Sequence, residues 1–253
     1  VSPGHDDITL VHDLRARRLL FACEGRDQDT VAQFVEDLAE HGGDAHKITA
    51  ACIDMSRSYI AGVGKHLPQA EITFDRFHVV KLANEALEEV RRAEVRSEPI
   101  LKRSRWMWLK DKHRWTKTQI AQHHDLSRRK LKTARAFRLK EELRDIFATA
   151  DSKAEAEQSL TAWLSWAKRS RLAPFRKLAR TIASHWEGIL NAFDSGLTNG
   201  GVEAINGLIQ AAKARARGYR TTRNVINLAD LVAGKRRYLQ TSPYHTTSGM
   251  VLA

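Results

Sequence analysis

The stretch that decides the fold is ITAACID, residues 48–54, a compact apolar run that stops at Asp54. Such a run predicts a buried central strand, since strands covered on both faces carry few polar residues. Downstream, the short run EITFD, residues 71–75, predicts a second strand that also stops at an aspartate. Apolar residues at helical spacing and the possible cap Ser56 predict a helix between them, ending near His66.

Upstream of this stretch, two β-rich runs at residues 8–11 and 18–23 are close enough to form a hairpin. Residues 29–40 then repeat apolar side chains at helical spacing until Gly42 and Gly43. Strands followed by helices predict an α/β domain. We expect residues 241–253, rich in Thr, Ser and Gly near their start, to form a disordered tail.

From Phe77 onward the strand signals disappear. Amphipathic helical patterns at residues 79–96, 128–149 and 153–170 take their place, and most of the tryptophans lie among them. This composition predicts a large all-helical insertion at residues 79–190 within the α/β core. We therefore divide the core into residues 5–78 and 191–240.

The charge of the chain favours a polyanionic partner. The formal net charge is +12, while 42% of the residues are hydrophobic, enough for a folded core. A charge this large favours nucleic acid, with a solvated basic surface as the alternative. No apolar run is long enough to cross a bilayer and no secretory leader is evident, so we expect a cytoplasmic protein without a membrane partner. The cysteines, Cys23 and Cys52, sit in apolar runs and are expected to be buried thiols.

Two aspartates are candidates for chemistry because ligands collect at the carboxyl ends of strands in open α/β sheets. Asp54 and Asp75 both occupy such places. For either residue alone, a helix cap or a turn is the alternative interpretation.

A third candidate is the turn and helix NGGVEAIN, residues 199–206, which places Glu203 near a helix start. An acid there could simply favour the helix N-terminus. Closely spaced cations follow, and together with Arg76, Asn199 and Asn206 they suit the backbone of DNA. These cations are Lys213, Arg215, Arg217, Arg220 and Arg223.

These motifs together resemble the ISL-three-type transposases of insertion sequences. The resemblance rests on IDMS at 53–56, PQAEITFDRFHVV at 68–80 and TNGGVEAIN at 198–206, and it extends from about residue 5 to about residue 238. The motifs SRW at 104–106 and GYR at 218–220 also fit. The family implies an RNase H-like core, a mixed sheet with flanking helices that a helical insertion interrupts and that holds an Asp-Asp-Glu triad.

Carried over to this chain, the resemblance makes Asp54 the second triad acid and Glu203 the third, both as metal ligands. Asp75 and His78 match an accessory Asp-x-x-His element that would lie beside the metals or orient the scissile phosphate. Two Mg²⁺ ions, for which Mn²⁺ can substitute, would activate a water or a 3′-hydroxyl and stabilise the leaving oxygen. The implied activity is cleavage of element ends in double-stranded DNA and transfer of the 3′-hydroxyl into target DNA.

The sequence also departs from the family pattern. The first triad aspartate normally precedes the stretch that matches residues 5–10, so we expect this chain to lack it, and Asp6 and Asp7 are weak substitutes. The zinc-binding and helix-turn-helix parts of the family are expected to be missing as well. Ala204 replaces a glycine and Gln210 a basic residue.

Several interpretations remain open at this stage. The chain could be a catalytically impaired fragment that binds DNA or full-length transposase as a regulator, or a basic RNA-associated protein. Residues 118–132 could form a DNA-binding helix-turn-helix or an ordinary helical hairpin. Trp106 and Trp108 could stack on unpaired bases or pack the insertion. Holding two element ends implies a homo-oligomer on DNA, associated with the nucleoid.

Overall fold

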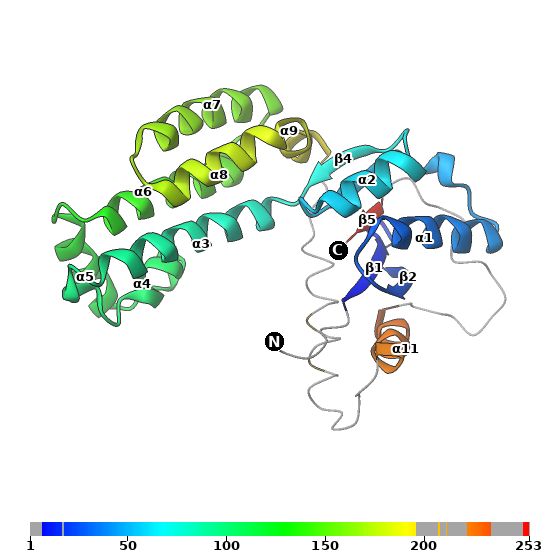
Figure 1. Ribbon diagram of the computed structural model, residues 1–253, viewed down its shortest axis with the longest axis horizontal. Helices are drawn as coiled ribbons and strands as arrows, with labels where there is room; N and C mark the ends of the chain where they lie inside the picture. The colour runs from blue at the N-terminus through cyan, green and yellow to red at the C-terminus, as the bar shows by residue number, and fades with distance from the viewer. Residues whose placement is uncertain are drawn as a thin grey trace. The chain divides into compact units, whose positions relative to one another are not determined.

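The computed structural model describes residues 7–16, 18–195, 207, 211, 222–233 and 250–252. The chain forms two compact units (Figure 1). The first unit contains Val1–Asp75 and Ser195–Ala253, and the second contains Arg76–Asp194. The second unit therefore falls between the two segments of the first along the sequence.

The first unit contains a mixed sheet with the strand order β2-β1-β5-β3-β4. Its strands are β1 (Ile8–Asp13), β2 (Arg18–Glu24), β3 (Ala50–Ile53), β4 (Glu71–Phe74) and β5 (Met250–Leu252). The predicted hairpin is present, since β1 and β2 are antiparallel, and β3 and β4 are parallel neighbours. The prediction of a mixed α/β protein is confirmed.

Strand β5 lies within residues 241–253, for which the sequence predicts a disordered tail; the other residues of that segment are outside the described part of the chain. Met250–Leu252 pair with β1 in antiparallel and with β3 in parallel orientation. A three-residue apolar run is too short to be recognised as a strand from sequence. It becomes one because the facing edges of β1 and β3 offer backbone donors and acceptors on both sides.

Helices α1 (Gln28–Glu40) and α2 (Arg57–His66) pack against each other beside the sheet (Figure 1). The α1 N-terminus is capped by Asp27, which accepts from the N–H groups of Asp29 and Thr30. A Cβ atom added to Gly62 would lie 2.7 Å from Val31 Cγ2, so close packing of the two helices requires glycine there. Ser56, the predicted side-chain cap of α2, makes no capping bond.

Two further elements complete the description of the first unit. The 3₁₀ turn η1 (Ala45–Lys47) leads toward β3. Helix α11 (Thr222–Ala233) packs on β2, where Val225 and Ala229 form a small buried cluster with Leu19. This contact ties the C-terminal segment of the unit to the N-terminal hairpin.

The second unit is helical throughout. Its long helix α3 (Arg76–Glu94) packs against α6 (Lys132–Thr149) and α8 (Ala173–Ser184). Helix α7 (Lys153–Arg169) packs against both α6 and α8. The remaining elements are η2 (Pro99–Leu101), α4 (Arg105–Leu109), η3 (Lys112–Arg114), α5 (Lys117–Ser127) and α9 (Trp186–Ser195).

Tryptophans divide between the core and the surface of this unit. Trp163 is buried and donates its indole N–H to the Leu139 carbonyl at 2.8 Å. Trp108 is also buried and donates to Ser104 Oγ at 2.9 Å, whereas 66% of Trp106 is exposed. Packing therefore accounts for Trp108 but not for Trp106, which lies under the Arg105 guanidinium at 5.0 Å.

No helix in the described part of the chain is long and apolar enough to cross a membrane.

Candidate functional site

Asp54 and Asp75 lie next to each other where the neighbouring strands β3 and β4 end. In the parallel pair β3–β4, Ile53 is opposite Phe74, and each aspartate follows directly. The Asp75 N–H donates to the Ile53 carbonyl at 3.3 Å, which extends this pairing by one residue. The two strand-ending aspartates are therefore neighbours along the sheet.

Each oxygen of the Asp54 carboxylate has its own partner. Oδ1 accepts the N–H of Ser56 at 2.8 Å, and Oδ2 forms an ion pair with Arg26. The Asp54 side chain is 12% exposed, against 48% for Arg26. The carboxylate thus serves partly as a local turn residue and partly as the anchor of a cation from another segment.

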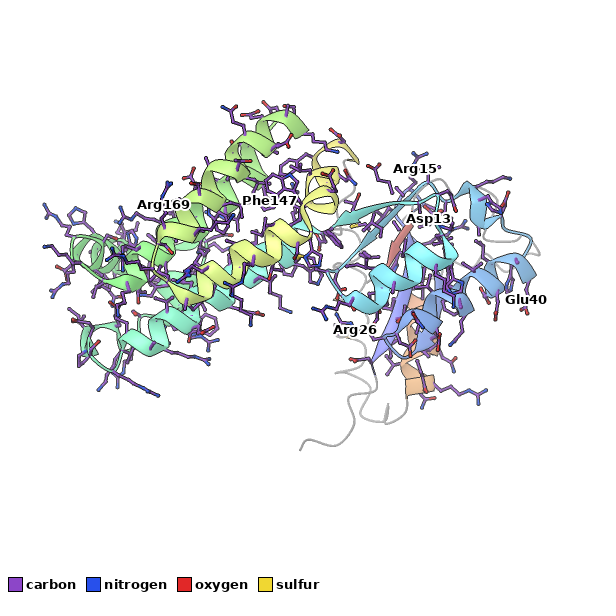
Figure 2. The ribbon with its side chains drawn as sticks, turned by 45° about the horizontal axis from the view of Figure 1, so that its top comes forward. Asp13, Arg15, Arg26, Glu40, Phe147 and Arg169 are labelled. Carbon is purple, nitrogen blue, oxygen red and sulfur yellow. The ribbon has the colours of Figure 1, made fainter. Side chains whose placement is uncertain are left out.

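Arg26 lies in the connection between β2 and α1 and is labelled in Figure 2. Partial burial opposes its charge, but the adjacent Asp54 carboxylate outweighs this and raises the pKa of Arg26. The guanidinium also lies 5.9 Å from the centre of the Tyr59 ring. It is a fixed positive charge beside the candidate acid.

A small hydrogen-bond network supports the connection that carries Arg26. Thr9 Oγ1 donates to the Gly25 carbonyl at 2.7 Å and lies 2.8 Å from the Tyr59 hydroxyl. Tyr59 is buried, and this burial raises the pKa of its phenol. Because Tyr59 belongs to α2, the network links the helix after Asp54 to both strands of the hairpin.

Asp75 is buried, with 4% of its surface exposed. Burial raises the pKa of the neighbouring Cys52 thiol to about 12, and the negative charge of Asp75 contributes to that shift. Cys23 and Cys52 are both buried free thiols, as expected. Asp75 is therefore less exposed than Asp54.

The predicted residues on α3 belong to the second unit. His78 is partly exposed in the first turn of this helix, and its ring centre lies 6.0 Å from that of Phe77. Arg76 is exposed and donates weakly to the Phe147 carbonyl at 3.4 Å. Both are within the first three residues of α3.

Most of the C-terminal predictions fall outside the described residues: Asn199, Glu203, Asn206, Lys213, Arg215, Arg217 and Arg220. Arg223 is described and is exposed on α11. Among the described residues, no group of three or more His, Cys, Asp or Glu side chains is placed to hold a metal ion. The pairing of Asp54 with Glu203 stays a prediction.

Sequence reasoning missed Arg26, although a signal for it existed. In a hairpin, the second strand ends beside the residues where the first strand begins. Because β1 is antiparallel to β5 and β3 is parallel to β5, the end of β2 and the end of β3 share one edge. A cation just after β2 could therefore have been expected near Asp54, had the strand order been known.

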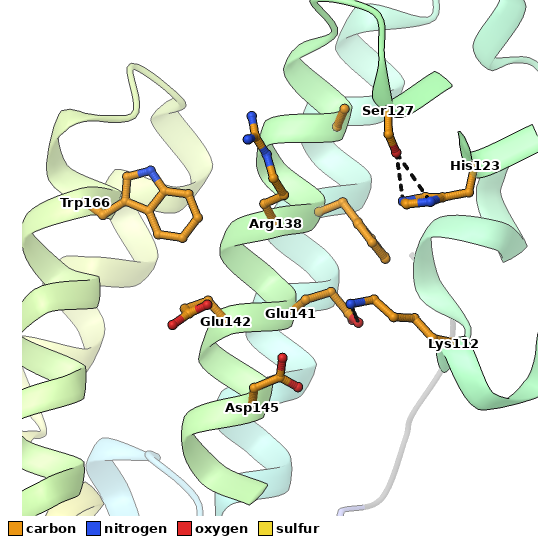
Figure 3. A pocket seen from close by; sticks show the side chains of 10 residues that line it. Lys112, His123, Ser127, Arg138, Glu141, Glu142, Asp145 and Trp166 are labelled. Carbon is orange, nitrogen blue, oxygen red and sulfur yellow. Dashed lines mark hydrogen bonds and ion pairs between the residues drawn. The ribbon is translucent and has the colours of Figure 1, made fainter. Parts of the chain in front are cut away.

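The second unit has a pocket of about 380 Å³ between α5, α6 and α7 (Figure 3). Lys112 forms an ion pair with Glu141 at 2.9 Å, and His123 contacts Ser127 Oγ on the opposite side of α6 from Trp166. The exposed acids Glu142 and Asp145 also line it. This excess of acids does not suit a phosphate, and none of the predicted site residues that the structure describes lines the pocket.

A family model described as a transposase, of the DDE type and the ISL-three group, matches residues 1–229. The chain is 32% identical over 225 residues to the transposase for insertion sequence element IS1001 of Bordetella parapertussis. It is 31% identical over 261 aligned positions to the transposase for insertion sequence element IS1557 of Mycobacterium tuberculosis.

These alignments cover 86% and 92% of this chain but 55% and 58% of the two relatives. The chain thus spans somewhat more than half the length of the curated relatives it matches. No solved structure matches it. Since the family model covers most of the sequence, the chain belongs to the ISL-three-type DDE transposases.

Proposed function

We propose that this chain is the catalytic part of an insertion-sequence DNA transposase with an RNase H-like core. It cuts double-stranded DNA at the ends of its element and joins the 3′-hydroxyl to target DNA. The observation that carries the proposal is the pair of aspartates at the carboxyl ends of neighbouring parallel strands. Family membership and the net charge of +12 support it.

The residues at this edge fit a hard divalent cation. Carboxylate oxygens are the ligands that Mg²⁺ and Mn²⁺ prefer, and a metal ion at Asp54 would take the place of the Arg26 guanidinium at Oδ2. Asp54 and Glu203 would hold the ion, with Asp75 and His78 beside it. When bound, the metal supplies Lewis acidity and lowers the pKa of a coordinated water or hydroxyl.

The chain's own residues would position the substrate. Arg76 and Arg223 are exposed cations suited to phosphate contacts, and the predicted cations after Glu203 would extend this charge along the DNA backbone. Arg26 holds Asp54 in one rotamer and would lie close to the scissile phosphate. Two element ends held together require at least two copies of the chain, associated with DNA in the nucleoid.

A second candidate is a DNA-binding chain that does not cleave by itself and regulates or pairs with full-length transposase. Strand β5 favours it. The strand beside β3 is Met-Val-Leu and contributes no carboxylate next to Asp54. On this reading the chain retains its affinity for DNA and lacks one acid of the triad.

Plasmid nicking separates the two candidates. The substrate is a supercoiled plasmid carrying the genomic DNA that flanks the coding sequence, incubated with Mg²⁺ or Mn²⁺. The parent chain is expected to nick it. Asp54→Asn and Glu203→Gln should each reduce the rate at least about a hundredfold, because metal chemistry contributes several kcal/mol to the transition state.

Glu40→Gln is the matched control, since Glu40 is an exposed acid on α1 of the same unit. Equal nicking by Asp54→Asn and Glu40→Gln would place the active site elsewhere. Retention of plasmid by the parent chain in a gel-shift assay, without any nicking, would favour the second candidate.

A further inference from the structure

A long stretch of the helical unit is free of acids and rich in cations. Between Glu157 and Glu187 the sequence has no Asp or Glu. It carries six exposed cations at the end of α7, in the following turn and along α8: Lys168, Arg169, Arg171, Arg176, Lys177 and Arg180. We call these six residues the α7–α8 basic surface; Arg169 is labelled in Figure 2.

These cations differ from the two clusters of the unit in which cations surround a buried acid. Glu88 is paired with Arg91, Arg92 and Arg105. Glu141 similarly neutralises Lys112, Lys140 and Arg144. Within the described part of the chain, no member of the α7–α8 basic surface forms an ion pair with an acid. The charge of this surface is therefore left without a neutralising acid.

The geometry of α8 gathers three of the cations on one side. At 3.6 residues per turn, positions 176, 177 and 180 fall within about 100° of arc. The buried positions Phe175, Leu178, Ala179 and Ile182 form the opposite side, which packs on the unit. The three cations therefore project into solvent together.

Helix stability explains the position of only some of these charges. Lys168 and Arg169 are in the last turn of α7, where cations are favourable. Arg176 and Lys177 have the opposite placement, because they lie close to the N-terminus of α8, where the helix dipole disfavours positive charge. No acid occupies the first turn of α8 to compensate.

Backbone conformation points the same way at Arg171. This residue follows the C-cap Ser170 of α7 and has φ +58°, in the left-handed region where glycine is favoured. An arginine at this position is strained relative to glycine. A cation is therefore present where the turn alone would favour a residue without a side chain.

Arg135 extends the surface to a neighbouring helix. It is exposed in the first turn of α6 and donates to the Ser170 carbonyl at 3.4 Å. This hydrogen bond brings the start of α6 beside the α7–α8 turn. Arg135 therefore adds a further cation next to the turn that carries Arg171.

We propose that the α7–α8 basic surface binds the phosphate backbone of duplex DNA, independently of sequence, as a contact separate from the acidic edge of the sheet. Its unpaired cations suit the release of counterions from a polyanion. The choice of duplex DNA among polyanions rests on the proposed function. The surface positions DNA and takes no part in phosphodiester chemistry.

The test is fluorescence anisotropy with a labelled duplex of arbitrary sequence, in EDTA and over a range of salt concentrations. The triple variant Arg176→Gln/Lys177→Gln/Arg180→Gln is expected to weaken binding roughly tenfold at low salt. The slope of log affinity against log salt concentration should be smaller in magnitude by about 2–3, because each lost phosphate contact reduces this slope by about 0.9.

The matched control is Arg15→Gln/Lys47→Gln/Lys65→Gln, which removes the same charge from exposed positions of the first unit. Equal losses in both triple variants would mean that net charge alone governs binding, and the proposal would be wrong. It would also be wrong if the α8 variant bound duplex normally but lost binding to single-stranded RNA or to vesicles of anionic lipid.

Arg171→Gly tests the surface without risk to the fold. It should keep or raise the melting temperature, by up to about 2–4 °C, while reducing the affinity for duplex. Arg103→Gly is its match, since Arg103 is an exposed arginine with φ +61°. Equal affinity loss in both variants would contradict the proposal. Because binding is measured in EDTA, failure of metal-dependent nicking leaves this result intact.

Discussion

At the scale of single residues, side chains of the same type can lie in very different surroundings. Asp54 and Asp75 are both aspartates that end a strand, yet one is paired with a cation and the other is buried beside a thiol. His12 is a further example, because it is 1% exposed and neither ring nitrogen has a hydrogen-bond partner among the described residues. Its burial makes the first unit sensitive to acid.

We predict that His12 lowers the acid stability of the protein. Burial lowers the pKa of His12 from 6.5 to about 4. Above pH 6.5 the folded and unfolded chains are both neutral at this site. As the pH falls from 6.5 to 4, only the unfolded chain gains the proton, so the free energy of unfolding decreases by roughly 3 kcal/mol.

Urea unfolding at pH 6.5 and at pH 4 measures this effect. His12→Leu should lose less stability than the parent between the two values, and the exposed His46→Leu should behave like the parent. An unchanged pH dependence in His12→Leu would show that His12 is solvated in the folded protein.

At the scale of elements, the residue that caps a helix N-terminus can be adjacent in sequence or far away. Asp27 caps α1 from the adjacent position, as the sequence pattern allows. Helix α6 begins at Lys132 without a side-chain cap from Leu131. Glu94, at the end of α3, instead accepts from the N–H groups of Lys132 and Thr133, each at 2.6 Å.

We predict that Glu94→Ala destabilises the helical unit by about 1–3 kcal/mol. The substitution leaves two N–H groups of α6 without their charged acceptor, and Thr133 Oγ1 loses its partner as well. Thermal unfolding followed by circular dichroism measures the loss. Glu98→Ala removes an exposed acid four residues away and should have little effect; a similar loss in both variants would argue against capping.

At the scale of the whole molecule, the sheet joins the two ends of the chain. The second unit consists of one continuous segment, Arg76–Asp194. The first unit is instead built from the two segments on either side of it along the sequence. Strand β5 pairs with β1 on one side and β3 on the other. The hairpin and the β3–β4 pair are therefore connected through three residues near the C-terminus.

We predict that Val251→Pro destabilises the first unit by about 3 kcal/mol or more. Val251 lies opposite His12 in β1 and Cys52 in β3, and proline removes a backbone donor in the middle of the sheet. Hydrogen exchange of the β1 and β3 amides would report the change. Val251→Thr keeps the donor and the β-branched shape, so exchange that is equally fast in both variants would show that β5 does not hold the sheet together.

The sequence by itself determined the elements and the family. Apolar runs and helical spacing are local properties, so β1 to β4, α1 and the long helices were predicted within a few residues. The strand-ending aspartates could be assigned from residue order because a strand and its following residue are contiguous. The motifs around Asp54, Asp75 and Glu203 were sufficient to suggest the transposase family.

Only the tertiary structure decided which segments meet. The pairing of β5 with β1 and β3, the ion pair of Arg26 with Asp54 and the cap from Glu94 each join residues far apart in sequence. No local pattern encodes such contacts, because they depend on how hydrogen-bonding edges and charges are brought together once the apolar faces are buried. The same reason separates Trp108 in the core from Trp106 on the surface, although they are two residues apart.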